Sequence, residues 1–138
     1  MNKAEILEFI KSNPACHLAT VDGNQPRVRG MLMYRADEDG ILFHTGGFKD
    51  ICKQLQQNPN VELCFNSADK GKQVRVSGTA EFIEDKSLKE EIVHERSFLK
   101  PFVEKQGYDM LKVFRIHSCT ATVWTMDTNF EPKEYIRL

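Results

Sequence analysis

Apolar and polar residues alternate along most of this chain, and that pattern predicts β-strands. The clearest example is the segment 73–83, where Val74, Val76 and Phe82 fall on one face and polar residues fall on the other. Such alternation is typical of an antiparallel strand with one buried face and one polar face. We expect six or seven strands, at residues 16–21, 27–34, 41–45, 61–65, 73–83 and 134–138, with 111–126 forming a long strand or a pair of strands. The segment 73–83 is expected to be the longest strand.

Three segments have helical spacing instead. Near the N-terminus, Asn2 and Glu5 resemble a capping box, and the apolar stripe behind them predicts a helix that covers an open end of the sheet. A short helix is expected within 47–59, where an Asn-Pro pair ends it. A broken helical region is expected from a Ser87 cap to residue 106, and the acidic segment 36–40 is expected to be a turn.

The length and the order of these elements predict the fold class. A chain of 138 residues is long enough to bury about two-thirds of its unfolded surface in one domain, so we expect a single domain over 1–138. Antiparallel turns and few helices favour a mostly β fold over a βαβ sheet. We therefore expect a small antiparallel β-barrel with peripheral helices.

Charge and cysteine usage exclude several kinds of protein. Lys and Arg number 19 against 20 Asp and Glu, so the net charge of −1 gives no strong field to attract nucleic acid. No apolar run is long enough for a membrane span, and no secretory leader is evident. The four cysteines and four histidines lack metal-ligand spacing, so we expect no metal site, and free thiols in the cytoplasm.

The segment 43–59 combines the end of a strand, a Gly-Gly pair and a short helix. Glycine reaches backbone angles that other residues avoid, which suits a sharp turn. Thr45 and Lys49 lie beside the predicted helix start, where free backbone N–H groups can bind phosphate. A simple glycine-relieved connection with a solvated lysine is the alternative. The segment lacks the spacing of a Rossmann or P-loop fingerprint.

Three further sets of polar or aromatic residues stand out. Arg27 and Arg29 share a strand face with Met31, which suggests either ordinary surface arginines or guanidinium groups that recognise phosphate or a ring carbonyl. Gln73 lies on a polar strand face that is either plain surface or the edge of a heteroaromatic ligand. Trp124, the only tryptophan, is either a core residue or a wall for a flat ligand.

Taken together, four short motifs resemble those of a known family. They are Arg27-Val28-Arg29-Gly30-Met31, Phe43-His44-Thr45, Lys49 ahead of residues 54–63, and Gln73-Val74-Arg75-Val76-Ser77-Gly78. In this order and spacing the chain resembles, over residues 1–126, the FMN-binding split-barrel family related to pyridoxamine 5′-phosphate oxidase. Within it, the small bacterial general-stress and nitroimidazole-resistance-like members are the most similar.

The resemblance implies FMN as cofactor and a homodimer with the cofactor at its interface. It places the arginine motif along the ring and phosphate, the histidine and threonine along the ribityl chain, and Lys49 on the phosphate. Gln73 would approach the flavin pyrimidine, often from the second subunit, and either Arg29 or Arg27 would be the positive group near it. The implied cofactor-binding residues are Arg27, Val28, Arg29, His44, Thr45, Lys49, Gln54, Gln73 and Trp124.

The resemblance also limits the activity. The true oxidase carries an arginine-leucine-histidine-x-arginine run after its late tryptophan, and residues 130–138 lack that run. We therefore expect a flavin-dependent reductase acting on a small planar acceptor rather than that oxidase, with no catalytic side chain assigned. His44 is either a proton donor or a packing residue. Two alternatives stay open: a non-catalytic protein that binds flavin, deazaflavin or haem, and a barrel of the OB type.

Overall fold

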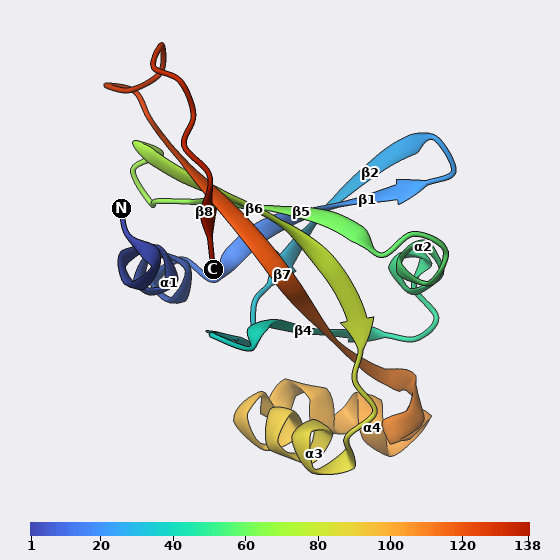
Figure 1. Cartoon of the computed structure of the whole chain (residues 1–138). Coiled ribbons are helices and arrows are strands. Elements are labelled where there is room, and N and C mark those ends of the chain that lie inside the picture. The colour runs from blue at the N-terminus through green and yellow to red at the C-terminus, as the bar shows by residue number, and fades with distance from the viewer.

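A computed structural model describes residues 1–138 and consists mainly of one antiparallel sheet (Figure 1). The strands follow the order β2-β1-β5-β6-β7-β4-β3, and β8 pairs with β7. The first and last strands of this order are not paired with each other, so the sheet is curved but not closed. The strands are β1 (Ala15–Asp22), β2 (Gln25–Leu32), β3 (Arg35–Asp37), β4 (Gly40–Gly46), β5 (Asn60–Asn66), β6 (Lys72–Phe82), β7 (Leu111–Thr125) and β8 (Ile136–Arg137).

The mostly β class is confirmed, and three details of the predicted strands are wrong. The sheet has eight strands rather than six or seven. The added one, β3, lies in the segment predicted as an acidic turn: Arg35–Asp37 pairs with β4 across a tight connection at Gly40, whose φ is +134°. The longest strand is β7, with 15 residues, and not β6, with 11.

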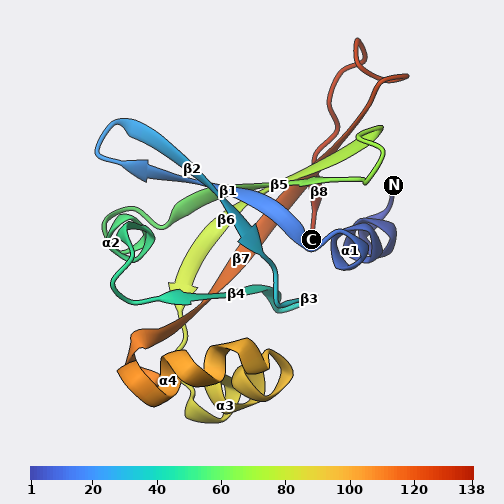
Figure 2. The same ribbon diagram turned by 180° about the vertical axis from the view of Figure 1, so that it is seen from behind.

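The helices lie around the sheet (Figures 1 and 2) and are α1 (Lys3–Ser12), α2 (Asp50–Gln57), α3 (Lys86–Glu95) and α4 (Lys100–Gln106). The capping box at α1 is confirmed, since Asn2 accepts from the Glu5 N–H and Glu5 accepts from the Asn2 N–H. Ile6 and Ile10 are fully buried, and α1 contacts the edge strand β3. None of the four helices is long and apolar enough to cross a membrane.

The segment between β6 and β7 forms a helical arm, residues 86–110, which lies below the sheet in Figure 1. Its first helix is capped by Asp85, which accepts from the Leu88 N–H, and not by Ser87 as predicted. The buried Lys89 donates to Glu84 at 3.0 Å and to the Tyr108 carbonyl at 3.1 Å. These bonds tie the start of the arm to its end. Ile92 of α3 packs with Leu42 of β4 and Val113 of β7 in a small buried cluster, which holds the arm beside these two strands.

The core explains why β4, β6 and β7 stay together. Phe43, Phe82 and Phe114 come from these three strands, and the rings of Phe43 and Phe114 stack with their centroids 5.5 Å apart. Phe43 and Phe114 are fully buried. Because side chains alternate along a strand, burying Phe43 turns its neighbour His44 toward the opposite face of β4, where the helical arm lies.

Candidate functional site

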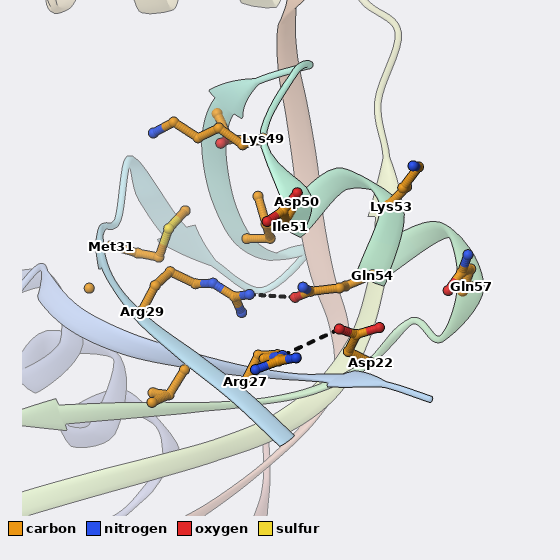
Figure 3. Close-up of a pocket in the computed structure, with 13 residues that line it drawn as sticks. Asp22, Arg27, Arg29, Met31, Lys49, Asp50, Ile51, Lys53, Gln54 and Gln57 are labelled. Carbon is orange, nitrogen blue, oxygen red and sulfur yellow. Dashed lines mark hydrogen bonds and ion pairs between the residues drawn. The ribbon is translucent and has the colours of Figure 1, made fainter. Parts of the chain in front are cut away.

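A polar cleft of about 780 Å³ lies between β2 and α2 (Figure 3). Its lining contains four cationic side chains and two carboxylates, which leaves an excess of two positive charges in a chain of net charge −1. These residues are Arg27, Arg29, Lys49, Lys53, Asp22 and Asp50. Such an excess favours an anionic ligand.

Two local structures bring the cations to the cleft. The β1–β2 hairpin turns at Gly23, whose φ is +64°, and its register sets Arg27 opposite Thr20 and Arg29 opposite Leu18. The strand–turn–helix unit formed by β4 and α2 supplies Lys49. The predicted strand, Gly-Gly turn and helix are thus present, but neither Gly46 nor Gly47 has a positive φ. A Cβ on Gly46 would lie 2.7 Å from the ring of the exposed Phe48, which would have to move, and a Cβ on Gly47 would lie 3.2 Å from the Lys112 side chain.

The two arginines of β2 differ in their partners. Arg27 makes an ion pair with Asp22 at 3.3 Å. Arg29 makes no ion pair; its Nη1 donates to Thr20 Oγ1 at 2.8 Å and to the Leu18 carbonyl at 3.3 Å, and its Nη2 donates to Gln54 Oε1. Figure 3 shows the Arg29 side chain, on β2, pointing at the side chain of Gln54, on α2. Burial lowers the pKa of Arg29, and the charge of Asp50 opposes that shift.

Lys49 is the N-cap residue of α2 and makes no capping hydrogen bond. Neither Lys49 nor Lys53 takes part in an ion pair. In Figure 3 Lys49 extends from the start of α2 away from the Arg29–Gln54 pair. Thr45, only 6% exposed, also lines the cleft. Three cations around the cleft therefore lack an anionic partner within the chain.

A second cavity of about 420 Å³ adjoins the first and is mostly apolar. The two share Gly30, Met31, Thr45 and Lys49, so they form one continuous space. The helical arm supplies Phe98 and Phe102 to the walls of this second cavity, and the turn between β4 and α2 supplies Phe48. Phe48 and Phe98 are 65% and 66% exposed, so these rings are not packed against the core.

His44 lies at the wall of the apolar cavity and contacts Arg96 of the helical arm. The His44 Nε2 is 2.7 Å from Arg96 Nη1, and Arg96 also donates to the carbonyls of Met33 (2.6 Å) and Leu32 (3.3 Å). A guanidinium can only donate, so Nε2 is the acceptor and the ring proton is on Nδ1. Burial, and then the charges of Arg96 and Lys49, lower the pKa of His44 to about 4. The ring is therefore neutral at pH 7.

Two of the predicted site residues lie elsewhere in this chain. Gln73 and Trp124 face each other across β6 and β7, and neither lines the polar cleft or the apolar cavity. Gln73 donates to Asn66 Oδ1 at 3.1 Å, and Trp124 donates to Asn129 Oδ1 at 2.7 Å. Trp124 is also not fully buried, so the expectation of a core tryptophan is wrong.

The other predicted residues fall at or beside the continuous space, and sequence reasoning missed several of their neighbours. Val28 lines the cleft and is 68% exposed, whereas Gln54 is only 7% exposed and contacts Arg29. Thr20 was missed, although a polar residue in the buried series at positions 16, 18 and 20 could have identified it. Arg96 was missed because no local pattern links it to His44, 52 residues away.

Comparison with known proteins gives a family match. The family model described as pyridoxamine 5′-phosphate oxidase matches residues 3–124. A curated pyridoxine/pyridoxamine 5′-phosphate oxidase 2 from Hydrogenovibrio crunogenus is 35% identical over 80 residues, which cover 57% of this chain and 37% of the relative. The matched stretch thus spans well under half the length of that enzyme.

Three solved structures have the same fold. A NimC/NimA family protein from Clostridium acetobutylicum has a TM-score of 0.79 at 26% identity, covering 98% of this chain and 92% of that one. General stress protein 26 from Bacillus anthracis has a TM-score of 0.70 at 19% identity, covering 99% and 98%. A pyridoxamine 5′-phosphate oxidase-related, FMN-binding protein from Nostoc punctiforme has a TM-score of 0.65 at 18% identity, covering 96% and 87%. The predicted split-barrel fold and family resemblance are confirmed.

Proposed function

Because the chain belongs to the pyridoxamine 5′-phosphate oxidase family, we propose that it is an FMN-binding flavoprotein that reduces a small planar acceptor. The observation that carries the proposal is the continuous space itself. Its polar part has three cations without anionic partners, and its other part is lined by aromatic and aliphatic side chains. FMN has the matching chemistry, with an anionic phosphate, a polyol chain and a flat ring.

The residues present fit this cofactor. Lys49 and Arg29 offer charged donors to a phosphate or a ring carbonyl, and both are free of carboxylate partners. Gly30 presents open backbone at the junction of the two cavities, since a Cβ there would meet nothing within 4 Å. The cavity volumes of about 780 and 420 Å³ are also in the range of ordinary ligand pockets.

Bound FMN would supply the redox chemistry that amino-acid side chains lack. The chain would contribute binding, orientation and exclusion of water. The rings of Phe48, Phe98 and Phe102 would shield a flat acceptor from solvent, and the fixed charge of Arg29 would favour negative charge in the bound group. The ring of His44 is neutral, so it lacks the acidic proton of an imidazolium, and its Nε2 accepts from Arg96; we therefore assign it a structural role rather than proton donation.

We propose that the working unit is a homodimer, because the site within one chain lacks two of its expected residues. Gln73 and Trp124 lie away from both cavities and would reach the cofactor from a second copy. The edge strand β2 leaves Val28 and Leu32 exposed by 68% and 46%, which a second copy could cover. We also propose a cytoplasmic location, since all four cysteines are free thiols and a reducing compartment keeps thiols in that state.

A second candidate is a flavin-binding protein without catalytic activity. It is favoured by the lack of an evident acid or base: the one histidine at the site is neutral and engaged with Arg96. The same engagement argues against His44 as an axial haem ligand. Turnover of nitro or quinone acceptors by the FMN-loaded protein, with a nicotinamide donor, distinguishes the reductase from this alternative.

The first test is the visible absorption spectrum of the purified protein, before and after addition of FMN and gel filtration. We expect a flavin band that co-elutes with protein of dimer size. A Soret band would replace FMN by haem, and a colourless protein that does not retain FMN would contradict the proposal.

Lys49→Ala should weaken FMN binding about tenfold or more while leaving the fold intact. The reason is that a charge-assisted contact to phosphate contributes on the order of 1.5–3 kcal/mol, and each ~1.4 kcal/mol changes the affinity tenfold. Flavin fluorescence titration and far-UV circular dichroism measure the two effects. Lys105→Ala is the matched control, because Lys105 is exposed on α4 and lines neither cavity. Equal affinities of both variants would remove Lys49 from the site.

A further inference from the structure

Two buried polar side chains contact Arg29 at the cleft: Gln54, which lines the cleft, and Thr20, which does not. Thr20 of β1 is 2% exposed and Gln54 of α2 is 7% exposed, although the positions around them in the buried series are apolar. Burying such groups is unfavourable unless they are hydrogen-bonded. Here Thr20 and Gln54 are hydrogen-bonded to each other, and both accept hydrogen bonds from Arg29.

The three side chains form a closed set of hydrogen bonds. The Thr20 hydroxyl donates to Gln54 Oε1 at 2.6 Å and accepts from Arg29 Nη1 at 2.8 Å. Arg29 Nη2 donates to the same Gln54 oxygen. The orientation of the amide is therefore fixed, because its oxygen faces a guanidinium that can only donate. A third acceptor, the Leu18 carbonyl, holds Nη1 from the strand.

All three partners of Arg29 are neutral, which separates it from the neighbouring arginine. Arg27 is paired with the carboxylate of Asp22, so much of its charge is compensated within the chain. Asp50 acts on Arg29 electrostatically but makes no ion pair with it. A guanidinium held by neutral acceptors keeps its position without losing its charge.

We propose that Thr20 and Gln54 are positioning residues whose neutral oxygens hold the Arg29 guanidinium rigidly while leaving its charge available to an anionic ligand. Preorganisation of this kind lowers the entropic cost of binding. The identity of that ligand as FMN rests on the proposed function. The clamp formed by Thr20, Gln54 and Arg29 can be tested without flavin.

The sharpest variant is Gln54→Glu, which keeps the shape of the side chain and adds a carboxylate at the Arg29 contact. We expect the affinity for FMN to fall about tenfold, while the melting temperature of the flavin-free protein stays equal or rises because an ion pair replaces a neutral bond. Gln57→Glu is the matched control: it adds the same charge at an exposed position of the same cleft and helix. For Gln57→Glu we expect the affinity for FMN to fall at most threefold.

Thr20→Val and Thr20→Ser test the positioning step in the protein without flavin. The ¹H–¹⁵N signals of the Arg29 guanidinium, assigned by their loss in Arg29→Lys, should be resolved in the wild type and in Thr20→Ser, and should broaden or average in Thr20→Val. Averaged signals in the wild type, or unchanged signals in Thr20→Val, would overturn the clamp. So would a Gln54→Glu variant that binds FMN as the wild type does. A wild type that binds no FMN but has a rigid Arg29 would refute the proposed function alone.

Discussion

Phe114→Ala is expected to lower the free energy of unfolding by about 3–5 kcal/mol, the usual cost of truncating a fully buried phenylalanine. Phe114 is 0% exposed, stacks on Phe43 at 5.5 Å and meets Phe82 edge-on at 6.1 Å. These three rings join β4, β6 and β7, so the cavity left by alanine would loosen all three strands. Urea unfolding, followed by circular dichroism, measures the loss as a lower midpoint.

The control for this prediction is the same substitution at a solvent-exposed phenylalanine. Phe130 lies in the long connection between β7 and β8 and is 98% exposed, so Phe130→Ala should change the unfolding midpoint very little. Phe114→Leu, which keeps most of the buried volume, should fall between the wild type and Phe114→Ala. Equal midpoints for Phe114→Ala and Phe130→Ala would show that the stacked rings do not hold the sheet together.

The parts of the fold that follow from local sequence were predictable. The alternation in β6 placed Val74 and Val76 in the core, where both are fully buried, and the capping box located the start of α1. β3 was missed because Asp37 and the two acidic residues that follow it are typical of a turn, and the segment becomes a strand only through pairing with β4. The cap of α3 was misplaced by two residues because aspartate and serine both cap helices well.

In the candidate site, too, some features follow from local sequence and others depend on tertiary contacts. Arg27 and Arg29 could be placed together because they lie two residues apart, on the same face of one strand. Thr45 and Lys49 could be placed together because they flank one turn. What holds these groups depends on tertiary contacts: Thr20 meets Gln54 across 34 residues, and His44 meets Arg96 across 52. No local pattern encodes such pairs. The sequence therefore identified most of the groups that line the two cavities, Gln54 among them, and missed Thr20 and Arg96, which contact Arg29 and His44.

The stability of the protein should fall as the pH is lowered from about 6.5 toward 4, because of His44. The ordinary pKa of histidine is about 6.5, and burial beside Arg96 and Lys49 lowers the pKa of His44 to about 4 in the folded protein. Between these values the unfolded chain binds a proton that the folded chain does not, so protons favour unfolding. Above pH 6.5 the His44 side chain is neutral in both the folded and the unfolded chain, so the stability that is lost at lower pH is fully present. The total loss should be on the order of 2–3 kcal/mol, since each pKa unit corresponds to about 1.4 kcal/mol.

The comparison of variants isolates this effect from other groups that titrate at low pH. His44→Gln keeps an oxygen that can accept from Arg96 but does not titrate, so its loss of stability between pH 6.5 and 4 should be smaller than that of the wild type. His94→Gln makes the same substitution at an exposed position of α3, where no buried contact is lost, and should leave the stability close to that of the wild type. Urea unfolding at a series of pH values gives the three curves. If the wild type and His44→Gln lose the same stability over this range, then His44 takes up its proton equally in the folded and unfolded chains, and the arm is not held by a neutral ring.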